Sequence, residues 1–276
     1  MHRHAHDEVH EHDRGLSYDL PVLARRRMIR LLAGVSLVPL AGCSTDDGAA
    51  TSAATTSGTT SAAATPDCAP IPEETAGPYP ADGSNGVNVL KESGVVRGDI
   101  RKSFGDSAGG TAEGVPLTVT LTVVDAASGC GTPRKGAAVY VWHCDREGAY
   151  SLYTEGVTDE NYLRGVQETD EKGQVTFTSV FPGCYPGRWP HIHFEVYGSL
   201  ADATAATSIT GTSQLAFPKE VCDTVYATEG YEASVPNLAD LSLDTDMVFR
   251  DGYERQLAAL EGGAGAGYTA TLTVPV

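Results

Sequence analysis

The sequence predicts an all-β domain, an antiparallel β-sandwich with long loops. Apolar residues alternate with threonine or other polar residues in several short runs, which is the pattern of strands buried on one face. Glycine- and proline-containing turn signals separate these runs, and stretches with helical periodicity are few. The stretch 68–276 has about 210 residues, which is enough for one domain with a sizeable core.

Five runs are expected to form strands. The first, residues 116–124, alternates leucine or valine with threonine, so its apolar side chains should share one face. The others are expected at residues 137–142, 173–180, 191–197 and 268–274. A short helix is expected at residues 251–261, just before the glycine-rich residues 262–265.

Residues 1–43 have the features of a bacterial export signal. A twin-arginine core, Arg25-Arg26-Arg27, precedes a mildly apolar run, 31–40, whose length of about ten residues is too short to span a bilayer. The run ends in Leu40-Ala41-Gly42-Cys43, which resembles a bacterial lipobox, so we expect a lipid on Cys43 and cleavage before it. The alternatives are a fully released protein and a short uncleaved anchor. The mature protein is therefore expected outside the cytoplasm, either held by lipid at the cell surface or released as an extracellular protein.

Residues 44–67 are expected to form a flexible linker, because they are almost wholly Ser, Thr, Ala and Gly and cannot bury a core. The net charge of the chain is −17, which argues against nucleic acid as a partner. No run after the signal is long and apolar enough to cross a membrane, so membrane contact is expected only through the lipid on Cys43.

Five cysteines follow Cys43, and export predicts that some of them form disulfides. An odd number leaves at least one thiol free, and the sequence does not decide the connectivity. No Cys-x-x-Cys pair occurs, so a zinc site built from these residues is not expected. The five are Cys68, Cys130, Cys144, Cys184 and Cys222.

The pentapeptide Pro190-His191-Ile192-His193-Phe194 is the strongest indication of chemistry. Residues i and i+2 of a strand point to the same face, so His191 and His193 should present their imidazoles side by side. Neutral imidazole is the commonest metal ligand in proteins. The pair therefore predicts half of a metal site at one edge of the sandwich, although a histidine pair alone also fits a pocket that binds no metal.

Further motifs occur in a fixed order between residues 68 and 231, and together they resemble the intradiol ring-cleavage dioxygenases, the family of catechol and protocatechuate dioxygenases. Each motif alone is weak, whereas the ordered string Tyr, Tyr, Arg-x-x-His-x-His is specific. The motifs are Glu74-Thr75-x-Gly77-Pro78-Tyr79, Arg97-x-Asp99-Ile100, Gly148-x-Tyr150-Ser151, Leu163-Arg164-Gly165-x-Gln167-x-Thr169-Asp170-x-x-Gly173, Pro182-Gly183-x-Tyr185, Arg188-x-x-His191-Ile192-His193-Phe194 and Ser213-Gln214-Leu215-x-Phe217-Pro218.

The resemblance implies one mononuclear non-haem Fe(III) ion, with Tyr150, Tyr185, His191 and His193 as its ligands. These donor types suit that ion. A phenol has a pKa of about 10 and becomes a good ligand only when a strongly Lewis-acidic ion removes its proton. Two phenolates offset much of the ferric charge, whereas a site with two histidines and one carboxylate would favour Fe(II).

The family's chemistry implies an enzyme that uses O2 to cleave a catechol-type diol between its two hydroxyl-bearing carbons, giving a cis,cis-muconate-type diacid. Tyr185 is expected to leave the metal and take up a proton. Arg188 is expected to stabilise the electron-rich ring, with a structural salt bridge as its alternative role. Gln214 is expected to form a hydrogen bond behind the ligands, and Tyr79 to line the pocket.

Two features depart from the family pattern. Cys184 stands where a bulky or apolar residue is expected, either in a disulfide that stiffens the turn at Tyr185 or as a free thiol beside iron. No long helical segment precedes the β domain, which leaves the oligomeric state open. His143 is expected to pack or to form a hydrogen bond, and the sequence selects no particular catechol as substrate.

Two other functions fit parts of the pattern. One is a non-catalytic, surface-tethered β-sandwich that binds a surface or a sugar, which would be colourless and free of iron. The other is an extradiol-type or other metallo-oxygenase that uses Fe(II) or copper, which would give a yellow ring-cleavage product or a different metal content. Phenolate ligands on Fe(III) would instead make the purified protein red-brown.

Overall fold

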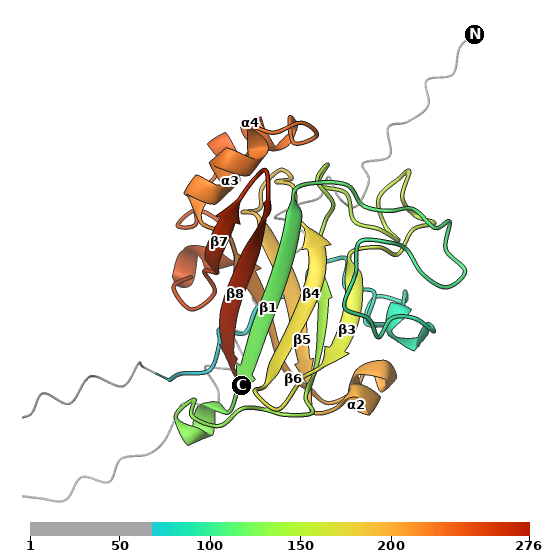
Figure 1. Cartoon of the computed structure of the whole chain (residues 1–276), viewed down its shortest axis with the longest axis vertical. Coiled ribbons are helices and arrows are strands. Elements are labelled where there is room, and N and C mark those ends of the chain that lie inside the picture. The colour runs from blue at the N-terminus through green and yellow to red at the C-terminus, as the bar shows by residue number, and fades with distance from the viewer. Residues whose placement is uncertain (1–67) are drawn as a thin grey trace, which may run out of the picture.

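The computed structural model describes residues 68–276. The expected signal at 1–43, the expected lipid on Cys43 and the expected linker at 44–67 lie outside these described residues. The described part consists mainly of two four-stranded sheets, with the strand orders β4-β1-β8-β7 and β3-β2-β5-β6 (Figure 1).

Each sheet combines strands from distant parts of the chain. The first contains β1 (Pro116–Val124), β4 (Gln174–Val180), β7 (Ala259–Gly263) and β8 (Gly267–Pro275). The second contains β2 (Ala138–Trp142), β3 (Arg164–Glu168), β5 (His191–Tyr197) and β6 (Ile209–Ala216). The helices are short, and they are α2 (Leu200–Ala205), α3 (Lys219–Tyr226) and α4 (Ser234–Ala239).

The inner faces of the two sheets form one hydrophobic core. Along β1 every second side chain is buried, which is the alternation that the threonine-rich sequence predicts. Leu117 and Leu121 of β1 belong to the same core cluster as Val139 of β2 and Phe194 of β5. The predicted β-sandwich is therefore confirmed.

The five predicted strands are present, with bounds that differ from the prediction by at most one residue. The pairing is not antiparallel throughout, because β8 runs parallel to β1 while it is antiparallel to β7. The β7–β8 hairpin turns the chain back, so that its last strand fills the edge of β1 that β4 leaves open. The three remaining strands, β3, β6 and β7, were not predicted.

The helix predicted at residues 251–261 is wrong. A short 3-10 turn, η4 (Phe249–Asp251), precedes this stretch, and β7 begins at Ala259. The backbone between them pairs with the end of β6, since the Ala216 N–H donates to Gln256 and the Ala258 N–H donates to Ala216. These tertiary hydrogen bonds outweigh a weak local helix propensity.

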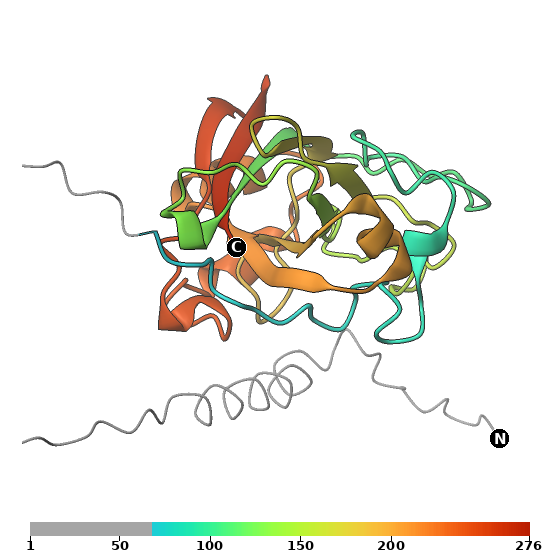
Figure 2. The ribbon, with the colours of Figure 1, turned by 90° about the horizontal axis from the view of Figure 1, so that it is seen from below.

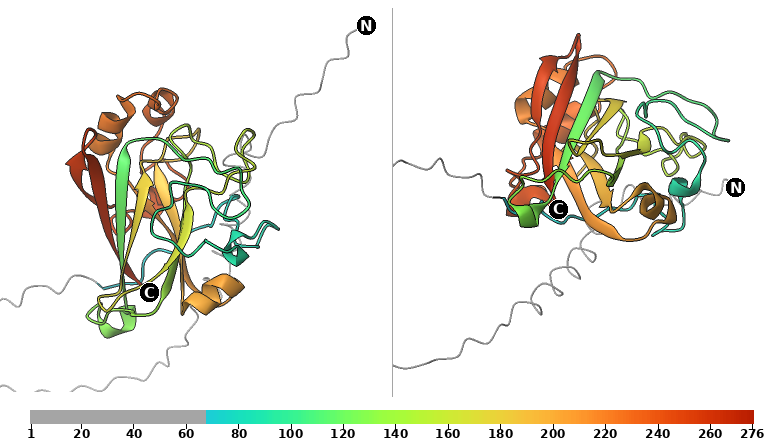
Figure 3. Two further views of the ribbon diagram at one scale, coloured as in Figure 1. Left: turned by 45° about the vertical axis from the view of Figure 1, so that its right-hand side comes forward. Right: turned by 60° about the horizontal axis from the view of Figure 1, so that its bottom comes forward.

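The segment that opens the described part, residues 68–82, runs beside both sheets. Its Ile71 N–H donates to Pro275 of β8, and its Glu74 N–H donates to Thr212 of β6. Figure 2 shows this blue-to-cyan segment following the orange strand β6. Longer loops gather on the other side of the molecule, next to β3, where Val166 pairs with Val95 and Val96 (Figure 3).

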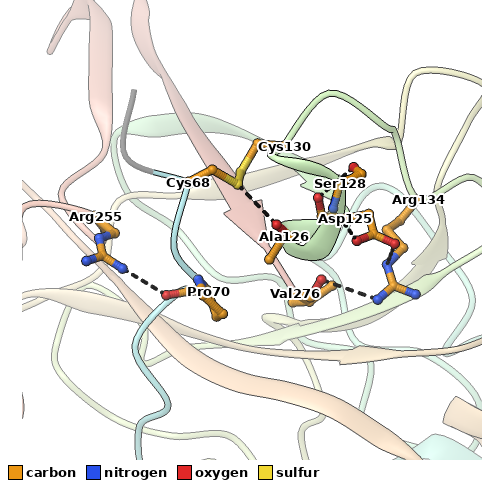
Figure 4. The surroundings of a disulfide bond; sticks show 9 residues. All are labelled: Cys68, Pro70, Asp125, Ala126, Ser128, Cys130, Arg134, Arg255 and Val276. Carbon is orange, nitrogen blue, oxygen red and sulfur yellow. Dashed lines mark hydrogen bonds and ion pairs between the residues drawn. A yellow bond between two sulfur atoms is a disulfide. The ribbon is translucent and has the colours of Figure 1, made fainter. Parts of the chain in front are cut away.

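One disulfide, Cys68–Cys130, joins the start of this segment to the loop after η3 (Ala126–Ser128) (Figure 4). Cys144, Cys184 and Cys222 are buried free thiols. Of the two roles that the sequence left open for Cys184, the structure therefore has the free thiol. Within residues 68–276 no helix has the length and apolar character needed to cross a membrane.

Candidate metal centre

Strand β5 places His191 and His193 on one face of its sheet, as their spacing predicts. Between and after them, Ile192 and Phe194 point into the sandwich core. The two histidines therefore lie on the outer face of the sheet, where each is 2% exposed. Loops and the opening segment cover this face, and they contribute Tyr79 and Tyr150 to a second apolar cluster.

Two tyrosines from separate loops reach the same point as the histidines. The hydroxyl of Tyr150 lies 3.5 Å from His191 Nε2, and the hydroxyl of Tyr185 lies 3.3 Å from that atom. His193 Nε2 is 3.1 Å from His191 Nε2. The structure thus brings all four predicted ligands together around one nitrogen atom.

Glycine allows the two tyrosine loops to approach each other. Gly148 has φ +87°, and a Cβ atom there would lie 3.1 Å from the Cβ of Tyr185. A side chain at this position would be strained by its backbone and would press against Tyr185. The glycine of the Gly148-x-Tyr150 motif is therefore explained by the close approach of the two tyrosine loops.

The hydrogen bonds of His191 define its tautomer. Its Nδ1 contacts the carbonyl oxygen of Trp189, which can only accept a hydrogen bond. Nδ1 therefore carries the proton, and the lone pair of Nε2 points toward the other three donor atoms. An imidazole with this arrangement is prepared to bind a metal ion.

Burial keeps His191, His193 and Tyr150 neutral in the absence of a metal. It lowers the pKa of His191 to about 3, an effect to which the charge of Arg188 adds, and it lowers the pKa of His193 well below its usual value. It also raises the pKa of Tyr150 well above its ordinary value of 10.0, and the neighbouring Tyr185 adds to this shift. The imidazoles are in the form that binds metals, and only a strong cation would ionise Tyr150.

The spacing of the four atoms fits ligation of a single ion. Donor atoms that lie about 2.1 Å from one ion, at angles of roughly 90–110°, are about 3.0–3.4 Å apart. The three distances to His191 Nε2 fall in or close to this range. Among residues 68–276 no group of three or more His, Cys, Asp or Glu is placed to hold a metal, so any metal here would need the phenols.

Arg188 lies behind the four groups in a buried polar network. Its Nε forms an ion pair with Asp246 at 3.0 Å, and its Nη2 donates to Gln214 at 2.6 Å. Gln214 in turn donates to the backbone oxygen of Thr75. Arg188 thus has the salt bridge that was its alternative role, and its guanidinium also contacts Gln214, the residue expected to form a hydrogen bond behind the ligands.

A second buried arginine, Arg164, has no role in the sequence analysis beyond its place in a motif. It is 1% exposed and donates to neutral oxygens of Tyr79, Pro80, Tyr140 and Ser151. Its charge is close enough to lower the pKa of His193, as is that of Arg188. Asp246 compensates the charge of Arg188, whereas Arg164 donates only to neutral oxygens and adds a positive charge near the site.

The opening segment forms part of the site's surroundings. The ring of Tyr79 lies 4.9 Å from the ring of Tyr150, and Gly77 approaches His193 so closely that a Cβ would lie 3.3 Å from its Cε1. Two other predicted neighbours have structural contacts. His143 hydrogen-bonds to Ser179, and the thiol of Cys184 faces the carbonyl of Arg188.

Comparison with known proteins finds dioxygenases. The protein-family model described as dioxygenase matches residues 95–191. A chlorocatechol 1,2-dioxygenase from Rhodococcus opacus is 38% identical over 55 residues, which is 20% of this chain and 21% of the relative. A hydroxyquinol 1,2-dioxygenase from Rhizobium sp. (strain MTP-10005) is 34% identical over 74 residues, covering 27% of this chain and 24% of the relative.

A solved structure extends the similarity over most of the described part. The intradiol ring-cleavage dioxygenase from Tetranychus urticae superposes with a TM-score of 0.59 and 26% identity, covering 75% of this chain and 94% of that chain. By contrast, the matched region spans only about a fifth to a quarter of the length of the two curated relatives.

Proposed function

We propose that this chain, which belongs to the intradiol ring-cleavage dioxygenases, cleaves a catechol-type diol with O2 between its two hydroxyl-bearing carbons. The observation that carries the proposal is the convergence of Tyr150, Tyr185 and His193 on the Nε2 atom of His191. Both atoms of O2 enter the product, so that a diol and O2 give one cis,cis-muconate-type diacid and nothing else.

The cofactor of this proposal is a single Fe(III) ion held by Tyr150, Tyr185, His191 and His193. When bound, such an ion would draw the protons from phenols and from the diol, hold both diol oxygens and make the aromatic ring reactive toward O2. As phenolates, the two tyrosines would favour the ferric over the ferrous state, because each contributes a negative charge. This donor set supports iron over zinc, whose sites use thiolate, imidazole and carboxylate ligands.

The two tyrosines have different surroundings, which supports different roles. Tyr150 is 2% exposed and packs against Tyr79, whereas Tyr185 lies on a turn and is partly exposed. If a bound Fe(III) ion had drawn off its phenolic proton, Tyr185 could therefore move from its position as a phenolate and accept a proton from a diol hydroxyl, while Tyr150 stays in place. This is general-base work at the Tyr185 hydroxyl oxygen.

Arg188 and Gln214 act together on the aromatic ring of the diol. When the diol gives a proton to Tyr185 it becomes negatively charged, and the buried guanidinium of Arg188 would stabilise that charge. Gln214 fixes the direction of that guanidinium through its short contact with Nη2. Arg164 adds a second positive charge on the side of Tyr79.

Tyr185→Phe tests this assignment. The variant keeps the ring but loses the proton acceptor, so we expect ring cleavage to fall by about 10²-fold or more while the protein stays folded. Turnover of catechol, followed by ultraviolet absorption of the diacid, measures this. Tyr226→Phe is a matched control, because Tyr226 donates its hydroxyl to Pro182 away from the four ligands. Undiminished cleavage by Tyr185→Phe would exclude the role of Tyr185.

We further propose that the protein is exported and held at the cell surface by lipid on Cys43. The Cys68–Cys130 disulfide supports export, since disulfides persist mainly outside the cytoplasm. A catechol in the medium would then be the substrate.

A further inference from the structure

The two histidines of the site differ in the hydrogen bonding of Nδ1, the ring nitrogen that faces away from the other ligands. His191 Nδ1 donates to the carbonyl of Trp189. His193 Nδ1 is buried and has no hydrogen-bond partner among the described residues. Metal-binding imidazoles usually donate this N–H to an acceptor, which fixes the ring orientation and raises the basicity of the ligand. Another contact must therefore hold the ring of His193.

That contact is the indole ring of Trp142. The register of β2 and β5 places Trp142 directly opposite His193, so both side chains leave the same face of the sheet. Their ring centroids are 4.9 Å apart, and their planes differ by 5°. Tyr140 stacks on the indole from behind, with a centroid distance of 4.9 Å. Strand pairing thus builds a buried stack that ends on the imidazole.

Trp142 contacts His193 through its ring face and not through a hydrogen bond. Indole Nε1 is a donor only, and within residues 68–276 it also lacks a partner. With His193 Nε2 turned toward a metal, Nδ1 carries the proton and is a donor as well. Two donors form no hydrogen bond with each other, so stacking is what remains to orient the ring.

We propose that Trp142 is the positioning residue of His193 and that His193 is the weaker electron donor of the two histidine ligands. The second part follows because an N–H without an acceptor leaves imidazole less basic than one that donates to a carbonyl. The proposal rests on the iron site of the proposed function. It assigns to Trp142 the task that a carboxylate or carbonyl performs for most metal-binding histidines.

Two substitutions of Trp142 test the positioning role. Trp142→Phe keeps a ring to stack on His193, whereas Trp142→Leu keeps apolar bulk without one. We expect Trp142→Leu to lower the iron affinity about 10- to 100-fold, the usual effect of removing a group that orients a ligand, and to shift the visible absorption band. Trp142→Phe should stay within about threefold of the wild type. Competition with a chelator and absorption spectroscopy measure both effects.

Phe177→Leu is the control for the loss of a buried aromatic ring. Phe177 is fully buried in β4 of the opposite sheet, within the main core. The Phe177→Leu variant should lose stability against urea to an extent similar to the Trp142→Leu variant. Its iron affinity and its visible absorption band should stay unchanged. A folded Trp142→Leu protein with wild-type affinity and band would overturn the positioning role. A wild-type protein that binds no iron would instead overturn the proposed function.

A measurement on the wild type tests the difference between the histidines even if Trp142→Leu does not fold. Gallium(III) has the charge of ferric iron and is diamagnetic, so the loaded protein is suited to NMR. The Nδ1–H proton of His191 should appear well downfield of that of His193, because only the former is hydrogen-bonded. Equal shifts would overturn the assignment of His193 as the weaker donor, and failure to bind gallium would count against the metal site itself.

Discussion

Asp246 holds the residues that lead into β5. One of its carboxylate oxygens accepts hydrogen bonds from Arg188 Nε and the Trp189 N–H, and the other accepts from the N–H groups of Val248 and Phe249. Burial alone would raise the pKa of Asp246, but the charge of Arg188 and these N–H donors outweigh it and lower the pKa. The carboxylate therefore stays ionised and fixes the residues just before His191.

Asp246→Asn should destabilise the fold strongly. The amide removes the charge that compensates Arg188, and breaking a buried ion pair from one side costs about 3–5 kcal/mol. Asp99→Asn is the control, because its pair with Arg101 is exposed and should contribute about 1 kcal/mol or less. Urea unfolding of both variants measures the difference. Equal, small losses would show that Asp246 does not hold the site.

Asp145 predicts a pH dependence of stability. Burial raises the pKa of this carboxyl to about 6, although the Ala149 N–H and the Tyr162 hydroxyl both donate to it. Because the pKa of Asp145 is higher in the folded than in the unfolded protein, its protonated carboxyl contributes to the free energy of unfolding. This contribution is fully present below the pKa of the unfolded state and is lost as pH rises through about 6. Relative to Asp145→Asn, the wild type should lose about 1–3 kcal/mol between pH 4 and 7. Thermal unfolding across this range tests it, and a constant difference would contradict it.

At the scale of single residues, the sequence predicted those site residues that local spacing or a local motif identifies. His191 and His193 could be found because i and i+2 share a face of a strand, and the tyrosines because ordered motifs mark them. Asp246 and Arg164 could not be assigned roles in the same way. Their partners, Arg188 and Tyr79, are 58 and 85 residues away, and no local pattern links them.

Among the elements, the opening segment depends on the Cys68–Cys130 disulfide. The bond joins residues 62 apart and fixes the segment before it reaches β6 and the site at Gly77. The region of η3 to which it is joined also contacts Val276, because the Ala126 N–H and the Arg134 guanidinium both donate to the backbone oxygen of Val276; Figure 4 shows the Arg134 contact.

The double variant Cys68→Ser, Cys130→Ser should lower the free energy of unfolding by about 2–5 kcal/mol, as expected for a native disulfide that closes a long loop. Hydrogen exchange of residues 70–79 should also increase. A reductant should reproduce both effects in the wild type and leave the variant unchanged. Unchanged exchange in these residues would show that the segment is held without the disulfide.

The sequence predicted strands with alternating apolar residues, such as β1 and β8, and strands with a mostly apolar run, such as β2. It did not predict β3, where Arg164 is buried by hydrogen bonds to distant residues, or β7, where Glu261 and two glycines follow Ala259 and Leu260. It also missed β6, because serine, threonine and glutamine are buried there by polar contacts that the residue types do not indicate. In each case tertiary partners, and not periodicity, define the element.

For the whole molecule, the start of the described part and the site lie at opposite ends of the sandwich. Cys68 is bonded near Ala126, which contacts Val276, and Gly211 beside the end of β5 also lies next to Val276. His191 is at the other end of β5. A tether that joins at Cys68 would therefore be attached at the end of the sandwich opposite the site.

Export and lipidation are tested on the full chain. Lipid on Cys43 is expected together with cleavage before it, so Cys43→Ala should incorporate no labelled fatty acid and keep its signal, which gel electrophoresis detects as a larger chain. Replacement of Arg25, Arg26 and Arg27 by lysine should keep the protein inside the cell. Release of the wild-type protein into the medium would contradict the lipid anchor, and fatty-acid labelling of Cys43→Ala would contradict the role of that residue.

The central claim is a ferric ion bound by two phenolates and two imidazoles. Metal analysis combined with visible absorption of the purified, correctly matured protein tests it most directly. The account predicts about one iron per chain and a red-brown charge-transfer band that disappears in His193→Ala. A colourless protein without iron, or a band that survives in His193→Ala, would contradict the account.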